Sequence, residues 1–237
     1  MSTPAIYAHR GSAGRTVGEN TLEAFRAAAG LGADGVELDV RRTADGCLIV
    51  HHDIEMPGLG PISGCRRQQL PEWMPTLSEA LEECCALALG VNVEVKSEIA
   101  GVSHDPEERC AIESAALCAA ASATTSIVVS SFSVPALAAV REVSSQLALA
   151  WLVGRPSTSS SPCAPWARGS LAALSLEGVH PSDAIVDAPY VSRAHDEGLA
   201  VRVWTVDAAE RVAELARLGV DAIITNDVAT ALRAVGR

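Results

Sequence analysis

The chain has 237 residues, of which 49% are apolar and 20% charged, so it can bury a large core and is not an intrinsically disordered protein. Its formal net charge of −11 disfavours a nucleic-acid backbone or an anionic membrane as the main partner. A chain of this length fits one large domain, and we expect that domain to span residues 1–237.

The sequence contains no pattern typical of targeting or of membrane insertion. The N-terminal run MSTPAIYAHRG lacks the basic start and apolar stretch of a signal peptide. No apolar run approaches the ~20 residues that a membrane-spanning helix needs. The seven cysteines are an odd number without paired metal-type spacing, which favours reduced thiols. We therefore expect a cytoplasmic protein without stable membrane insertion.

Strand-like apolar runs alternate with helical patterns along the whole chain. Most of the runs are continuously apolar, as expected of parallel strands that are buried on both faces. The run Cys47–His51 is expected to form a hairpin with the second strand. The expected barrel or sheet strands are Ala5–Ala8, Gly35–Val40, Val91–Val95, Ser126–Ser130, Leu147–Leu152, Ala172–Leu176, Ala200–Thr205 and Ala222–Thr225.

Helical patterns fall between these strands, and glycines that stop helices follow several of them, namely Gly30, Gly198 and Gly219. Eight strands with intervening helices favour an α/β fold of the TIM (β/α)8 barrel type. An open doubly wound sheet is the alternative, because alternation alone does not prove closure. The expected helices are Thr21–Leu31, Leu77–Leu87, Pro106–Ala121, Val134–Val143, Ala188–Glu197, Ala208–Leu218 and Val228–Val235.

Two segments are predicted to be loops. Asp53–Pro75 is rich in Gly, Pro and Arg and forms a short insertion after the second strand. Arg155–Pro165 is a low-complexity patch, and the helical signal of Ala164–Leu171, which overlaps it, is weak.

The strongest chemical signal is a pair of carboxylates one residue apart, Glu37 and Asp39. Residues i and i+2 of a strand project from the same face, so both side chains can bind one hard divalent cation. In isolation such a pair is more often a solvated strand edge than a metal site. Its apolar neighbours predict a buried strand, however, where charges need a partner.

A third carboxylate, Glu94, repeats this spacing with Lys96, which is the only lysine in the chain. The other 17 cationic side chains are arginines, so a lysine beside a predicted acidic cluster suggests a positional requirement.

Further polar residues fall at the C-terminal ends of the expected strands, where parallel α/β barrels build their active sites. His9 and Arg10 follow the first strand, His52 follows the hairpin, and Trp204 ends the seventh strand. Two imidazoles, three carboxylates, a guanidinium and an ammonium suit chemistry on a phosphate ester. The chain lacks the GxGxxG, Gly-x-x-x-x-Gly-Lys and Gly-x-Ser-x-Gly motifs of nucleotide-binding proteins and serine hydrolases.

These motifs, in order, resemble the glycerophosphodiester phosphodiesterase family over nearly the entire chain. The resemblance is carried by His9-Arg10-Gly11, Glu19-Asn20-Thr21, Glu37-Leu38-Asp39-Val40, His52-Asp53, Glu94-Val95-Lys96 and Trp204-Thr205-Val206. It implies a TIM barrel that hydrolyses a small-molecule glycerophosphodiester to an alcohol and glycerol phosphate. It also implies a divalent cation, with Mg²⁺ and Ca²⁺ as the main candidates and Mn²⁺ as a third.

The resemblance assigns a role to each residue of the expected site. Glu37, Asp39 and Glu94 would bind the metal, His9 and His52 would be catalytic, and Arg10 and Lys96 would contact the phosphate. Apart from the resemblance, Trp204 could be core or, because it ends a strand, a wall of the substrate pocket, and Phe132 is a weaker candidate for the same wall. We favour His52 as base and His9 as acid, although the sequence does not decide between them. The nucleophile could be water or the neighbouring glycerol hydroxyl.

Two features depart from the family pattern. The insertion after His-Asp is short, and the last strand ends in Thr225-Asn226-Asp227 instead of Thr-Asp. Asn226 therefore either replaces the expected carboxylate or marks a shift of the next helix. Alternative functions are a lysophospholipase D-like activity on lipid headgroups, or a catalytically silent barrel that binds phosphodiesters.

Other polar residues are expected to play no part in the chemistry. Arg41 and Arg42 are predicted to be surface charges. His104, His180 and His195 are predicted to lie in loops or helices outside the site. Glu19 and Asn20 could cap the first helix or reach the pocket.

Overall fold

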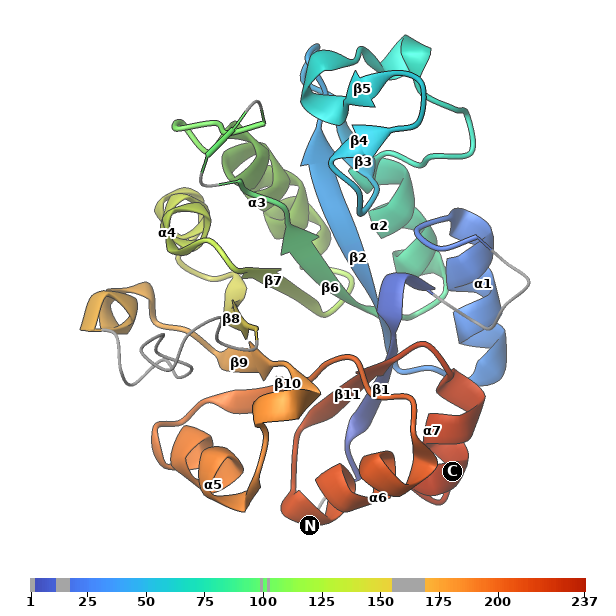
Figure 1. Ribbon diagram of the computed structural model, residues 1–237, viewed down its shortest axis with the longest axis vertical. Helices are drawn as coiled ribbons and strands as arrows, with labels where there is room; N and C mark the ends of the chain where they lie inside the picture. The colour runs from blue at the N-terminus through green and yellow to red at the C-terminus, as the bar shows by residue number, and fades with distance from the viewer. Residues whose placement is uncertain (1–2, 12–17, 99, 102, 155–168) are drawn as a thin grey trace.

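The chain folds into a closed barrel of parallel strands with helices around it (Figure 1). The computed structural model describes residues 3–11, 18–98, 100–101, 103–154 and 169–237. Strand β1 pairs in parallel with both β2 and β11, which closes the sheet and confirms the predicted TIM barrel. In spatial order the strands are β1 (Ala5–Ala8), β2 (Gly35–Arg42), β6 (Gly90–Val95), β7 (Ile127–Ser131), β8 (Ala148–Val153), β9 (Gly178–Pro181), β10 (Ala200–Val203) and β11 (Ala222–Thr225).

The helices cover the outer face of this barrel (Figure 1). The side chains of Thr21, Asp187 and Asp227 accept hydrogen bonds from the first turns of α1, α5 and α7, which fixes where these helices begin. Among the described helices, none combines the length and the apolar character needed to cross a bilayer. The α-helices are α1 (Leu22–Leu31), α2 (Leu77–Ala86), α3 (Arg109–Ala121), α4 (Val134–Val143), α5 (Ala188–Asp196), α6 (Ala209–Leu218) and α7 (Val228–Ala234).

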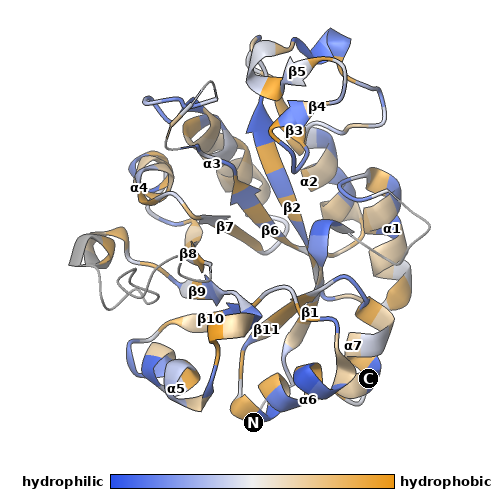
Figure 2. Ribbon diagram, in the orientation of Figure 1, coloured by the Kyte–Doolittle hydropathy of each residue, from blue (hydrophilic) through white to orange (hydrophobic). Residues whose placement is uncertain are grey.

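Strand β2 shows how the alternation of side chains separates the core from the site. Val36, Leu38 and Val40 are fully buried in the hydrophobic core between the strands and the helices. Glu37 and Asp39 alternate with them and therefore face the barrel axis. Figure 2 shows this strand banded in hydrophobic and hydrophilic colours. The apolar partners thus hold the strand in place while two carboxylates are directed inward.

The insertion after β2 has a small core of its own. Strand β3 (Leu48–Val50) pairs antiparallel with β2, which confirms the expected hairpin. Within the segment predicted as a loop, β4 (Glu55–Met56) and β5 (Gly60–Pro61) form a two-stranded ribbon, followed by the 3-10 helices Ile62–Gly64 and Arg67–Gln69. Its buried side chains are Ile49, Ile62, Cys65, Leu70 and Met74.

Two expectations about local structure are wrong. The run Ala172–Leu176 is not a strand, because a 3-10 helix spans Gly169–Leu174 and the barrel strand β9 begins at Gly178. A short apolar run does not by itself distinguish a strand from a helical turn. Gly30 does not end α1, which continues to Leu31 and ends at Gly32 with a positive φ of 87°. Arg155–Pro165 and most of Ala164–Leu171 lie outside the described residues.

Candidate active site

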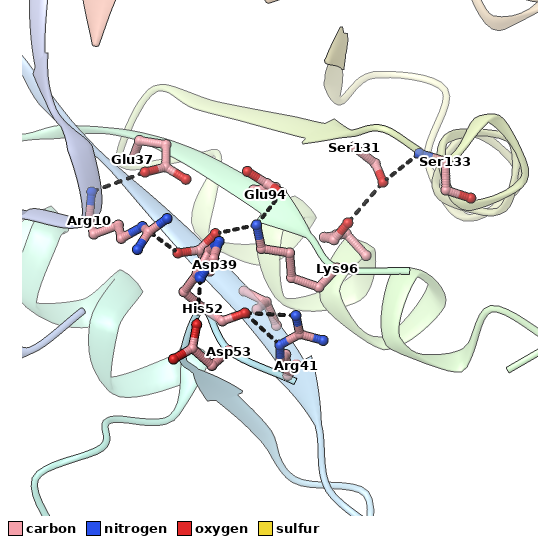
Figure 3. A network of polar contacts seen from close by, with 12 residues as sticks. Arg10, Glu37, Asp39, Arg41, His52, Asp53, Glu94, Lys96, Ser131 and Ser133 are labelled. Carbon is pink, nitrogen blue, oxygen red and sulfur yellow. Dashed lines mark hydrogen bonds and ion pairs between the residues drawn. The ribbon is translucent and has the colours of Figure 1, made fainter. Parts of the chain in front are cut away.

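Three buried carboxylates meet at the C-terminal end of the barrel. Glu37 and Asp39 project from β2, and Glu94 lies on β6 directly beside Asp39 in the sheet register. One oxygen from each carboxylate lies within 4.8 Å of the other two. The three residues predicted as metal ligands are therefore together (Figure 3).

Two cationic side chains contact this cluster. The Lys96 ammonium lies 2.7 Å from Asp39 Oδ1 and also forms an ion pair with Glu94. Arg10 Nε lies 3.4 Å from Asp39 Oδ2. The backbone of Arg10 has a positive φ of 54°, and its N–H donates to Glu37 Oε2 at 3.0 Å. Lys96 and Arg10 thus lie where a phosphate beside the carboxylates would meet them (Figure 3).

The three carboxyl groups of the cluster are not equally stabilised in their charged forms. Burial raises the pKa of Glu37 well above its usual range, and the nearby carboxylates Asp39 and Glu94 raise it further. Burial likewise raises the pKa of Glu94. For Asp39 burial acts in the same direction, but the Lys96 ammonium and other hydrogen-bond donors outweigh it, so the pKa of Asp39 is lowered. Glu37 is therefore the carboxylate that lacks a strong cationic partner.

A divalent cation fits this imbalance. Among the described residues, the buried oxygen Glu37 Oε1 has no hydrogen-bond partner. An unpaired buried charge is strongly unfavourable. All three side chains offer carboxylate oxygens, which hard cations such as Mg²⁺ and Ca²⁺ prefer. Glu37, Asp39 and Glu94 could therefore hold one such ion.

Asn20 and Glu19, which precede α1, contact residues of the site. Asn20 is buried, and its amide donates to Asp39 Oδ2 at 2.8 Å. Glu19 accepts from Arg10 Nη1 at 2.9 Å. The helix cap is Thr21, so of the two roles left open for Glu19 and Asn20 the structure favours the one at the pocket over the cap of α1. Asn20 orients a predicted metal ligand, and Glu19 orients a predicted phosphate ligand.

His9 is oriented by the opposite end of the chain. Its Nδ1 lies 2.7 Å from Asn226 Oδ1, and its Nε2 lies 3.9 Å from Glu37 Oε2. The Asn226 amide nitrogen donates to Asp207 at 2.9 Å, so its oxygen must face His9 and accept the Nδ1 proton. Asp227, by contrast, caps α7. Asn226, which stands between Thr225 and Asp227 directly after β11, thus places an amide beside His9.

His52 is paired with a carboxylate and held by its backbone. Its Nδ1 lies 2.8 Å from Asp53 Oδ1. The His52 carbonyl accepts two hydrogen bonds from Arg41, at 2.8 and 2.7 Å (Figure 3). The Arg41 side chain is only 11% exposed, so its interpretation as a surface charge is wrong. Arg42 pairs with Glu113 and is 23% exposed.

These groups surround one cavity of about 250 Å³. His9, Arg10, Glu37, His52, Glu94 and Lys96 line one part of it. Trp204 lies on the other part, as predicted, together with Phe132, Leu152, Thr205 and Ile224. Asp39 lies behind this lining, in contact with Arg10 and Lys96. Seven of the eight predicted site residues therefore line a single pocket, and the eighth supports it.

Asn92 also lines the cavity and did not enter the predicted site. It is fully buried, and neither of its amide atoms has a hydrogen-bond partner among the described residues. It precedes Glu94 by two positions on β6, so the same alternation that places Glu94 inside could have identified it.

His180 lies in strand β9, so its predicted place in a loop or helix is wrong. It is fully buried, and burial lowers the pKa of its imidazole well below the usual value. Its carbonyl accepts a hydrogen bond of 2.7 Å from Trp204 Nε1. His180 therefore supports the pocket wall through its backbone.

Known proteins of one family resemble this chain in sequence and in fold. Residues 9–230 match the glycerophosphoryl diester phosphodiesterase family. The chain is 30% identical to a glycerophosphodiester phosphodiesterase of Caldanaerobacter subterraneus over 97% of both chains, and 28% identical to one of Bacillus altitudinis over 93% of this chain and 94% of the relative. An Oleispira antarctica phosphodiesterase, solved with the product sn-glycerol-3-phosphate, superposes with a TM-score of 0.83 at 25% identity over 99% and 98% of the chains. The resemblance seen in the motifs is confirmed: the chain belongs to the glycerophosphoryl diester phosphodiesterase family and is an enzyme of that family.

Proposed function

We propose that this enzyme uses a divalent cation to hydrolyse glycerophosphodiesters to an alcohol and sn-glycerol 3-phosphate. One observation carries the proposal: three buried carboxylates, a guanidinium, an ammonium and two imidazoles surround a single cavity. The family membership and the product bound to the similar Oleispira antarctica enzyme support the choice of substrate.

In this proposal Glu37, Asp39 and Glu94 hold the cation, and Mg²⁺, Ca²⁺ and Mn²⁺ are the candidates. When bound, such an ion neutralises charge on the phosphoryl oxygens and acts as a Lewis acid. Arg10 and Lys96 bind the phosphate from either side of Asp39, and they stabilise the charge that develops in the transition state.

The partners of the two imidazoles support different roles. The Asp53 carboxylate stabilises a positive charge on His52, which favours His52 as the base that takes a proton from the nucleophile. The partner of His9 is the neutral amide of Asn226, which does not stabilise an imidazolium in the same way. We therefore assign to His9 Nε2 the transfer of a proton to the leaving alcohol.

A direct assay tests the activity. The protein is incubated with glycerophosphocholine or glycerophosphoethanolamine in the presence of Mg²⁺, Ca²⁺, Mn²⁺ or EDTA, and release of sn-glycerol 3-phosphate is measured. We expect release with at least one metal and none with EDTA. Binding of the diesters without turnover under every condition would instead identify a catalytically silent barrel.

A change of leaving group separates the roles of the two histidines. His9→Ala should lower hydrolysis of glycerophosphocholine by roughly 10²–10⁴-fold, the range typical of general acid catalysis. The same variant should lose far less with a p-nitrophenyl diester of glycerol phosphate, because that leaving group needs no proton. His52→Ala should lose activity on both substrates. The reverse pattern would exchange the two assignments.

One observation favours a second candidate, a lysophospholipase D-like activity. The Phe132 side chain lines the cavity and is 48% exposed, so an apolar substituent could contact it. Lysophosphatidylcholine in the same assay tests this activity, since release of lysophosphatidic acid at a higher kcat/KM than that for glycerophosphocholine would favour it.

A further inference from the structure

Phe132 and Trp204 form what we call the aromatic corner of the cavity. Their ring centroids lie 5.7 Å apart and the ring planes meet at 89°. In this edge-to-face arrangement the edge of one ring meets the face of the other, and both residues line the cavity. The face of an aromatic ring carries a partial negative potential that attracts cations.

Hydrogen bonds anchor the residues on both sides of Phe132 and the Trp204 side chain. Ser131, on one side of Phe132, is buried and donates to the Val95 carbonyl at 2.8 Å (Figure 3). Ser133, on the other side, is buried and caps α4. Trp204 is held by its hydrogen bond to the His180 carbonyl. The backbone beside Phe132 and the ring of Trp204 are therefore held before a ligand binds, which favours binding.

The two rings of the aromatic corner follow different strands: Phe132 follows β7, next to β6, and Trp204 lies across the barrel from the acidic cluster. Trp204 follows β10, which is four strands from β6 and thus opposite it in the ring of eight. Of the residues that line the cavity, those that follow Lys96 in the chain include no charged side chain. A diester whose phosphate contacts Arg10 and Lys96 has room to extend one of its two ester groups toward this uncharged lining.

We propose that the aromatic corner binds a quaternary ammonium group on the leaving alcohol, so that choline-type glycerophosphodiesters are the preferred substrates. The inference rests on the proposed phosphodiesterase activity. No lysine or arginine lines this part of the cavity among the described residues, so a ligand cation meets no like charge from this wall. The net charge of −11 favours the approach of a cationic headgroup.

The test compares glycerophosphocholine with its uncharged isostere, the 3,3-dimethylbutyl ester of glycerol phosphate. The two leaving alcohols have the same shape, and only one carries a positive charge. We expect kcat/KM to be roughly tenfold higher for glycerophosphocholine, within the range of cation–π contacts in partly desolvated sites. Phe132→Leu keeps an apolar side chain but removes one π face, so it should bring the ratio of the two kcat/KM values close to one.

Matched variants make this result specific. Phe132→Tyr retains the π face and should retain the preference. Ile112→Leu changes a side chain on α3 that is 40% exposed and lies outside the cavity, so it should leave the ratio unchanged. A wild-type ratio of one or less, or a ratio that Phe132→Leu does not lower, would overturn the inference.

A binding measurement keeps this inference separate from the activity. Isothermal titration of both diesters into the His52→Ala variant gives the same affinity ratio without turnover. If the wild-type protein hydrolyses neither diester, the proposed function fails, and the titration still decides between a corner that prefers the cation and one that does not. Equal affinities would reject the aromatic corner as a cation site.

Discussion

The two parts of the cavity come from different parts of the chain and differ in chemistry. Every charged residue among those that line it lies between His9 and Lys96. The lining that follows in the sequence consists of Phe132, Leu152, Trp204, Thr205 and Ile224. The first part contains the groups proposed to act on the phosphate, and the second contains the surfaces that would contact the alcohol. Substitutions in the second part can therefore change substrate choice without altering the first.

The two parts also differ in whether their buried ionisable side chains have charged partners. In the first part the buried carboxylate Asp39 is surrounded by Lys96, Arg10 and Asn20. Beyond Lys96, the buried His180 supports Trp204 through its carbonyl, and burial lowers the pKa of its imidazole, which favours the uncharged form. Charge is thus concentrated on one side of the barrel, where partners stabilise it.

The largest expected effect comes from the metal cluster. Glu37→Gln removes a charge that the proposed cation requires, so kcat/KM should fall by roughly 10³-fold or more at saturating metal. Titration calorimetry should show weaker Mg²⁺ binding in the same variant. Glu23→Gln, at an exposed carboxylate on α1, is the control. Near-normal activity of Glu37→Gln would contradict the proposed metal site.

Lys96→Met should separate phosphate binding from metal binding. Loss of the ammonium should lower kcat/KM by roughly 10²–10³-fold, as for other groups that stabilise transition-state charge. Metal affinity should rise, because Lys96 no longer competes for the oxygens of Asp39 and Glu94. If metal affinity falls instead, Lys96 mainly holds the carboxylates in place. Calorimetry and steady-state kinetics measure the two effects independently.

A smaller effect is expected for the partner of His52. Asp53→Asn should lower kcat about tenfold, less than for a buried carboxylate, because the Asp53 side chain is 73% exposed and solvent screens its charge. Asp196→Asn, at an exposed position on α5, should have no effect. A rise in KM at constant kcat would show that Asp53 contacts the substrate and does not act through His52.

The buried imidazole of His180 should make the stability of the protein depend on pH. The pKa of His180 is lowered in the folded state, so the unfolded chain binds a proton that the folded protein excludes. The free energy of unfolding should therefore decrease as pH falls below about 6.5, by up to about 1.4 kcal/mol per pH unit. His180→Gln should remove this part of the slope in urea titrations, whereas His104→Gln, at an exposed loop residue, should not. An unchanged slope in His180→Gln would place the proton uptake elsewhere.

Much of the barrel and of the site could be predicted because the information is local. The spacing of Glu37, Asp39 and Glu94 defines one face of neighbouring strands, and seven of the eight barrel strands lie close to their expected ranges. The exception is β9, whose four residues Gly178–Pro181 include a glycine, a histidine and a proline, so no apolar run marks it.

The contacts that orient the proposed catalytic and metal-binding groups could not be predicted in the same way. Arg41 reaches the His52 carbonyl only because the hairpin folds back along β2. Asn20 meets Asp39 only because of the turn taken before α1. Such contacts depend on side-chain placement between segments that no periodic pattern connects.

Closure of the barrel has a consequence for how the enzyme matures. His9 and Asn226 are 217 positions apart, yet their side chains are bonded at 2.7 Å. During synthesis the histidine therefore leaves the ribosome 217 positions before the amide that orients its ring. A nascent chain that already contains every proposed metal ligand therefore still lacks an oriented proton donor. The proposed proton donor is thus oriented only once strands β1 and β11 have joined.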